Sequence, residues 1–311
     1  MSSKQGNQTF LKGRSCICSF DSASGCGGAS PVVTQIIIDG NSLFLAGSMT
    51  SYKGVARNRI CKINATTAAL DATFDTVSGF NTTTNVMYLN GNALYVGGGF
   101  TTYKGTTRQR IAKLNATTAA LDATFNSASG FSAQLRALTF DGTYLYCGGE
   151  FTTYKGVTRQ YVAKINATTA ALDATFDSAS GFNGIVRGPG SFILYDNNLY
   201  CGGDFTTYKG IARQRVAKLN ATTAALDLIF DTTVALTGGI VVDLLKDNDN
   251  LYVVGLFTLY GTIARPRFAI LNAVHGSLDS FVQRLVLTDI NGYYIFNDID
   301  NADYLVKQLL I

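Results

Sequence analysis

Residues 94–125 read LYVGGGFTTYKGTTRQRIAKLNATTAALDATF, and this stretch decides the interpretation of the whole chain. Its Tyr-Lys-Gly motif recurs every 51 to 54 residues, and an arginine stands five residues after each tyrosine. A period near 50 residues is typical of the four-stranded blade of a β-propeller, in which each blade buries its faces against its neighbours. The sequence therefore predicts an all-β propeller of tandem blades. The five copies of the motif begin at Tyr52, Tyr103, Tyr154, Tyr208 and the degenerate Tyr260-Gly261.

The third copy shows how one period divides into strands. An apolar run at 135–140 and a second run at 144–149 flank the turn residues 141–143, which predicts a hairpin. The glycines at the end of the second run would permit close packing near a crowded axis. Residues 161–165 give a third strand, and 172–176 give a short outer strand after a turn. Four strands per period are what a propeller requires.

The repeat boundaries and the ends of the chain predict how the ring closes. The N-terminal segment at 15–25 resembles the outer-strand region at 175–181, and residues 283–311 contain strand-like runs that lack an outer strand. Together they would form a sixth, composite blade that hides both edge strands. The alternative is five blades plus a separate C-terminal β appendage. In either case we expect one domain over residues 1–311, with repeats at about 31–80, 81–131, 132–182, 183–235 and 236–282.

The repeating pattern resembles a known family. Leu94-Tyr-Val-Gly-Gly-Gly-Phe100, Tyr103-Lys-Gly105 and Ile111-Ala-Lys-Leu-Asn115 are similar to the delta-60 type repeat of bacterial surface and phage proteins, which is also related to fungal cortical polarity markers. The resemblance extends over roughly residues 15–282. The strands at 288–296 and 304–306 are weakly similar to the B-type domains of Gram-positive surface adhesins. Neither resemblance brings a catalytic residue to this chain.

Composition narrows the classes of partner. Hydrophobic residues make up 47% of the chain, charged residues 15%, and the formal net charge is +4. The lysines and arginines are spread at blade intervals, so we expect no nucleic-acid partner. No apolar run is long enough to span a bilayer, and residues 1–10 lack the pattern of a secretion signal.

The six cysteines are expected to be reduced. Cys147 and Cys201 occupy a column that holds Leu45, Val96 and Val253 in the other copies, which is typical of apolar core positions. Cys61 stands in a column of alanines. Cys16, Cys18 and Cys26 crowd the N-terminal segment without a zinc-ligand spacing, and a local bridge that involves Cys26 is the one exception left open.

Two charged columns are retained in all five copies. A charged residue that recurs in every blade indicates a structural role, such as an arginine that clamps a carboxylate or the main chain. A single functional site would not require five copies. The arginine column is Arg57, Arg108, Arg159, Arg213 and Arg265, and the aspartate column is Asp71, Asp122, Asp173, Asp227 and Asp279.

A few charged residues differ between copies and are candidate contact residues. Glu150 and Asp204 share a column that holds no other carboxylate, and a glycosidase-like pair there would need a raised pKa. A second arginine column, at Arg59, Arg110, Arg215 and Arg267, becomes tyrosine in the third copy and is expected to face solvent. His275, which is the one histidine, has no repeated partner for catalysis or metal binding. We expect no cofactor, no bound metal and no enzymatic activity.

These observations predict a non-enzymatic structural or adhesive protein at a virion or cell exterior. A phage virion component, such as a decoration, tail or fibre-associated protein, is the leading interpretation. Its partners would be other proteins of an assembly or a surface glycan, since Thr/Asn/Tyr-rich turns suit adaptable contacts. A bacterial surface or secreted adhesin and an intracellular protein-interaction platform are the alternatives, and a glycan-active hydrolase is the outside alternative.

Overall fold

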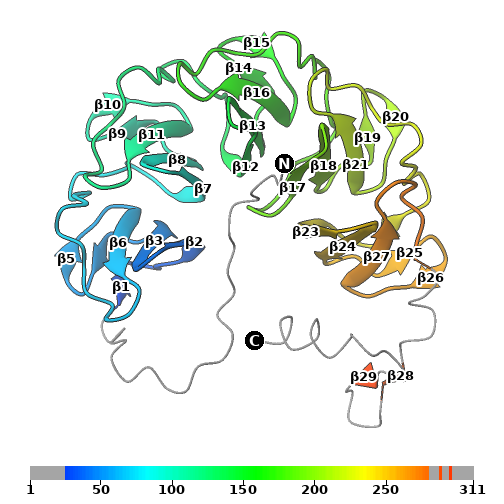
Figure 1. Ribbon diagram of the computed structural model, residues 1–311, viewed down its shortest axis with the longest axis horizontal. Coiled ribbons are helices and arrows are strands. Elements are labelled where there is room, and N and C mark those ends of the chain that lie inside the picture. Colours follow the sequence, from blue (N-terminus) through cyan, green and yellow to red (C-terminus); the bar gives the residue numbers. More distant parts are fainter. Residues whose placement is uncertain (1–24, 280–286, 289–293, 296–311) are drawn as a thin grey trace.

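The computed structural model describes residues 25–279, 287–288 and 294–295. This part of the chain is all-β, and five blades follow one another along an arc (Figure 1). The first strand of each central sheet lies toward the middle of the arc, and the small hairpins lie at its outer rim. The predicted β-propeller fold is confirmed. The described residues contain no helix that could span a membrane.

Each blade is built on a three-stranded antiparallel sheet in which the second strand is central. The first and second strands form a hairpin around an Asx-type turn; in the third blade the Asp141 carboxylate accepts the main-chain N–H groups of Thr143 and Tyr144. The sheets are β2 (Val33–Asp39), β3 (Ser42–Gly47) and β6 (Ile60–Asn64); β7 (Thr84–Asn90), β8 (Ala93–Gly98) and β11 (Ile111–Asn115); β12 (Leu135–Phe140), β13 (Tyr144–Gly149) and β16 (Val162–Asn166); β17 (Phe192–Tyr195), β18 (Asn198–Gly202) and β21 (Val216–Asn220); β23 (Val241–Asp247), β24 (Asn250–Gly255) and β27 (Phe268–Asn272).

A small hairpin stands between the second and third strands of every blade, and the sequence analysis does not predict it. The Tyr-Lys-Gly motif forms its turn, with Lys104 and Gly105 both at positive φ. Such a turn follows the twist of the two flanking strands, which explains the glycine. The hairpins are β4 (Ser51–Tyr52) with β5 (Val55–Ala56), β9 (Thr102–Tyr103) with β10 (Thr106–Thr107), β14 (Thr153–Tyr154) with β15 (Val157–Thr158), β19 (Thr207–Tyr208) with β20 (Ile211–Ala212), and β25 (Leu259–Tyr260) with β26 (Ile263–Ala264). Two of them gain a third strand, β1 (Cys26–Gly27) beside β4 and β22 (Leu236–Thr237) beside β25.

The predicted outer strand at 172–176 is wrong. Only a single bridge forms there, between Ile165 and Leu172. The carboxylate of Asp173 then accepts hydrogen bonds from the N–H and hydroxyl groups of Thr175, which turns the chain away from the sheet. The same bridge recurs in the other four blades.

Blades pack on one another through glycines and buried tyrosines. A Cβ on Gly148 would lie 2.7 Å from both Phe192 and Val186 of the next blade, so that only glycine leaves room there. The Tyr146 hydroxyl donates to the carbonyl of Ala221 in the next blade, 2.8 Å away. Equivalent bonds join Tyr95 to Ala167 and Tyr200 to Ala273. A buried donor that keeps its partner avoids a large desolvation cost, so these bonds fix the spacing of adjacent blades.

The described cysteines occupy core positions as predicted. Cys61, Cys147 and Cys201 are fully buried, and each is paired across the sheet in the column that the repeat assigns to it. Cys26 is a free thiol whose sulfur lies 3.8 Å from that of Met49. Burial raises the pKa of the Cys61 thiol to about 12. Cys16 and Cys18 lie outside the described residues.

The two ends of the arc expose apolar side chains. Ile36 in β2 is 58% exposed, whereas Met87 at the same position of β7 is buried. Leu245 of β23 is 56% exposed, and the first and fifth blades face one another across the open side of the arc. The expected composite blade, 15–25 with 283–311, lies almost wholly outside the described residues. Its described part is Gly25 and the short hairpin of β28 (Leu287–Thr288) and β29 (Tyr294–Ile295).

Candidate binding surfaces

The first arginine column lies inside the blades, directly after each rim hairpin. In the first four blades the side chain is buried, and in the fifth Arg265 is half-buried. In every copy the guanidinium Nη1 donates to the carbonyl of the preceding residue at 2.7–2.8 Å. Arg159 and Arg213 also lie 3.5 and 3.6 Å from the carboxylates of Asp177 and Asp231, which lead to the next blade. This is the geometry of an internal clamp on the main chain.

In the first four blades the aspartate carboxylate pairs with a lysine of the third strand. The sequence analysis missed this lysine column. In the second blade Lys113 lies 2.9 Å from Asp122. Burial alone would raise the pKa of Asp122, but hydrogen bonds from Thr124 and Lys113 outweigh it and lower this pKa to about 2. The other pairs are Lys62 with Asp71, Lys164 with Asp173, and Lys218 with Asp227; in the fifth blade Ile270 takes the lysine position ahead of Asp279.

The expectation that the second arginine column faces solvent is wrong for three of its members. Arg59, Arg110 and Arg215 are half-buried, and each donates from Nη1 to the carbonyl that follows the second strand of its own blade. The backbone at this column has φ near +70° in all five blades, and Tyr161 adopts it too. A left-handed backbone is costly for residues other than glycine. Its recurrence in every blade therefore indicates that the turn requires this conformation.

Glu150 and Asp204 each pair with an arginine, and Arg187 interacts electrostatically with both carboxylates. Arg136 donates to Glu150 at 2.6 Å, and Arg187 makes a two-pronged pair with Asp204 at 2.5 Å. Gln134 also donates to Glu150, at 2.9 Å. Burial alone would raise the pKa of Glu150, but hydrogen bonds from Gln134 and Arg136 outweigh it and lower this pKa. The charge of Arg187 from the next blade acts in the same direction.

Arginines therefore pair with both carboxylates of this network, and the pKa of Glu150 is lowered. A glycosidase acid needs the opposite, a carboxyl group whose pKa is raised. The network also reaches the second blade, since Asn85 donates to Gln134 and to the carbonyl of Leu135. It can join three blades and present two half-exposed guanidinium groups.

The hydrogen bonds of His275 to the described residues are made by its main chain. Its main-chain N–H donates to Asn272, and its carbonyl accepts from Asp231. Among the described residues, no group of three or more potential ligands could hold a metal ion.

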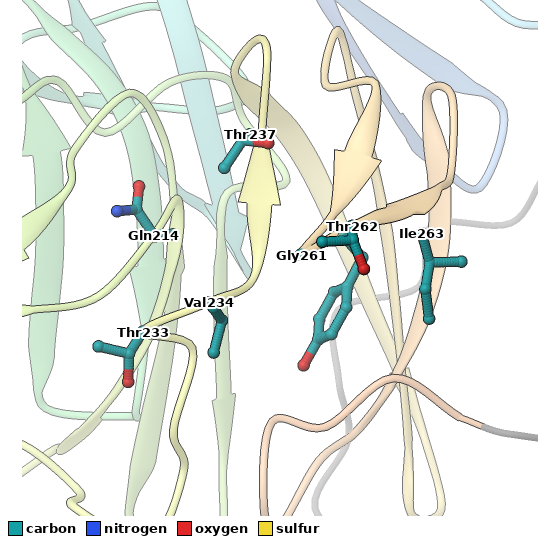
Figure 2. A pocket seen from close by; sticks show the side chains of 8 residues that line it. Gln214, Thr233, Val234, Thr237, Gly261, Thr262 and Ile263 are labelled. Atoms are coloured by element: carbon teal, nitrogen blue, oxygen red, sulfur yellow. The ribbon is translucent and has the colours of Figure 1, made fainter.

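A cavity of about 460 Å³ opens at the rim between the fourth and fifth blades (Figure 2). Gln214, Thr233 and Val234 come from the fourth-blade side, and Gly261, Thr262 and Ile263 from the hairpin of the fifth blade. Its remaining lining residues are Thr237 and Tyr260. None of the lining side chains is charged. The sequence signal was the degenerate Tyr-Gly copy, whose structural effect could not be read without the fold.

Three exposed apolar residues stand in the segment that leads from the fourth blade to the fifth, and one of them, Val234, lines this cavity. Leu228 and Ile229, 67% and 66% exposed, stand where the third copy has Ala174 and Thr175. Val234, 75% exposed, stands where that copy has Ser180. Exposed apolar residues that gather on one surface indicate an interaction site.

Comparisons with known proteins find similar solved structures and one family model that matches part of the chain. The chain is similar to the computationally designed Ika8 protein (12% identity, 86% of this chain and 78% of that chain, TM-score 0.48). It is also similar to the WD40 beta propeller domain of Doa1 (8% identity, 81% and 69%, TM-score 0.45). No curated protein matches the chain. Residues 92–125, which run from the second blade into the joint that follows it, match the family described as a domain of unknown function (DUF5122) beta-propeller.

Proposed function

We propose that this chain is a non-enzymatic structural or adhesive propeller that contacts other proteins or a surface at the exterior of a particle or cell. A phage virion component is the form that we favour, as a decoration, tail or fibre-associated protein. The resemblance of the repeats to the delta-60 type, found in bacterial surface and phage proteins, supports this setting. A bacterial surface adhesin is the second form, and it would bind through the same joint between the fourth and fifth blades.

The observation that carries the proposal is the exposed apolar segment at 228–229. The equivalent positions in the second and third copies hold Ala123 and Thr124, and Ala174 and Thr175. A fully buried leucine side chain is worth about 1.5–3 kcal/mol relative to an exposed one, so two exposed large side chains offer useful binding energy to a partner. The first three copies all hold alanine and threonine at these two positions, so the two large apolar residues distinguish the fourth copy from them.

The state of the carboxylates supports a non-enzymatic role. Glu150 and Asp204 are engaged by arginines, and the pKa of Glu150 is lowered. A general acid that works near neutral pH requires a raised pKa.

High-resolution imaging of the native particle or cell surface tests the proposal. We expect density for the five blades at repeating sites, with the joint between the fourth and fifth blades against a neighbouring molecule. The double variant L228A/I229T restores the residues of the third copy and should abolish attachment of purified protein to the stripped particle. The matched control V77T changes another exposed apolar residue, at the joint between the first and second blades, and should attach normally. Attachment that L228A/I229T leaves intact would refute the proposed surface. A monomeric protein absent from any particle or cell exterior would refute the role.

A further inference from the structure

The motif tyrosine of the fifth blade differs from the other four in its exposure. Tyr52, Tyr103, Tyr154 and Tyr208 are buried, whereas Tyr260 is half-buried and lines the rim cavity. All five rings are held alike, because each hydroxyl donates to a carbonyl near the blade's last turn; for Tyr260 this is Gly276, at 3.0 Å. The fifth blade therefore presents a fixed aromatic ring at an accessible place.

The fifth blade also lacks the lysine that follows this tyrosine in the other four. In the first four blades the residue after the tyrosine is lysine, and its ammonium group lies 5.5–6.0 Å from the centre of the tyrosine ring. Lys209 also donates to the carbonyl of Asp177 at 2.6 Å and so crosses the joint between blades. Gly261 takes the lysine position in the fifth blade, with the same left-handed backbone. Without a side chain there, the joint stays open.

The chemistry of the lining selects the class of ligand. Threonine hydroxyls and the amide of Gln214 both donate and accept hydrogen bonds, and no charged side chain lines the cavity. The face of an aromatic ring carries partial negative charge and packs well against weakly positive C–H groups. A pyranose ring has one C–H-rich face and a rim of hydroxyl groups. A volume of about 460 Å³ lies within the range of about 300–1,000 Å³ that is usual for small-molecule sites.

We infer that the rim cavity between the fourth and fifth blades binds a neutral sugar ring, stacked on Tyr260. Val234 and Ile263 flank the C–H face, and Gln214 with Thr233, Thr237 and Thr262 takes the hydroxyl groups. The inference rests on the proposed adhesive function and names its ligand class. An anionic sugar lacks a cationic partner among the lining residues.

Saturation-transfer NMR and a printed array of neutral and acidic oligosaccharides test the inference on the full chain. We expect neutral saccharides to bind at millimolar or lower concentration, with the strongest saturation on the C–H protons of one ring face. The double variant G261K/T262G rebuilds the Tyr-Lys-Gly turn of the other blades and should weaken binding at least tenfold. Its turn occurs four times in this protein, so we expect the variant to fold, as circular dichroism would verify. The matched control K53G changes the same motif position in the first blade and should bind like the wild type.

The outcomes separate this inference from the proposed function. Attachment to the particle without binding of any neutral saccharide up to about 10 mM, roughly ten times the upper end of the range in which enzymes bind their small substrates, would overturn the sugar site alone. Equal sugar binding by wild type and G261K/T262G would overturn it as well. Binding of an apolar peptide in place of saccharide, lost in G261K/T262G, would reassign the cavity to a protein partner. If the protein binds sugar but is found on no particle or cell exterior, the sugar site is retained and the proposed setting is refuted.

Discussion

Gly148→Ala should destabilise the protein at the contact between the third and fourth blades. The new Cβ would lie 2.7 Å from Phe192 Cζ and 2.7 Å from Val186 Cγ1. Carbon atoms in contact prefer separations of about 3.5–4.0 Å, so each pair would have to move apart by about 1 Å. Both neighbours are buried and belong to the next blade, which means that the two sheets must separate or both side chains must leave their rotamers.

The expected size follows from two opposing effects. Inserting one methyl group into a packed core costs about 1–3 kcal/mol. Replacing glycine by alanine also restricts the unfolded chain, which returns about 0.4–1 kcal/mol. The net loss should be about 1–2 kcal/mol, and for a domain of this size the midpoint of thermal unfolding should fall by about 2–8 °C.

Gly99→Ala is the matched control. Gly99 follows the equivalent strand of the second blade, but its Cβ would have 3.7 Å to the nearest atom, the amide oxygen of Gln134. This variant should unfold within about 0.5 kcal/mol of the wild type, or slightly above it. Urea unfolding followed by circular dichroism measures both. Equal stability of the two variants would show that Gly148 does not set the spacing between the third and fourth blades.

Three further predictions concern buried groups and charge. Because the pKa of Asp122 is lowered to about 2, its hydrogen bonds with Thr124 and Lys113 contribute stability that is present above pH 4 and is lost between about pH 4 and pH 2; D122N should flatten the acid limb of a stability–pH curve. Tyr146→Phe removes the donor to Ala221 and should cost about 0.5–1.5 kcal/mol in urea unfolding, whereas an unchanged midpoint would contradict a role for this inter-blade bond. Cys147 and Cys201 should resist a maleimide reagent in the native protein and react in urea, because both thiols are fully buried with pKa values raised well above the usual one; mass spectrometry reads this directly.

Much of the fold could be predicted because the same residue types recur at the same positions of each copy, and each type indicates a strand, a turn or a core position. Alternating apolar runs around an Asp-Gly turn predicted β12 and β13 at their observed bounds. The column of Cys147, Leu45 and Val96 identified core positions from residue type alone, and all three side chains are buried. In each case the pattern spans five or more residues or copies, which is long enough for its periodicity to be decisive.

The misses came from features that are shorter than that. The rim hairpins have two-residue strands, so periodicity gives no signal, and only the turn residues such as Lys104-Gly105 point to them. The run Leu172-Asp-Ala-Thr-Phe176 alternates like a strand, but the Asp173 side chain turns the backbone by bonding Thr175. A local side-chain bond outweighed weak strand propensity.

The candidate sites were harder to predict because they depend on which columns meet in space. The column of Glu150 and Asp204 was visible in the sequence, but the arginines that pair with them, Arg136 of β12 and Arg187 of the segment before β17, come from outside that column. The rim cavity arises from an absence, Gly261 in place of lysine, whose effect depends on a contact across the joint.

The outward face of the fifth blade departs from the repeat in a way that limits what can pack on it. Gly202 leaves room for Val241 of the next blade, whose Cγ1 would lie 2.7 Å from a Cβ there, but Val254 occupies the same position in the fifth blade. Ile270 replaces the lysine that pairs with an aspartate in every earlier blade. A further blade of the repeat sequence would therefore clash at Val254, and any element that covers this face must present a different and more apolar surface. The fifth copy thus departs from the repeat both on this face and at the rim cavity that it shares with the fourth blade.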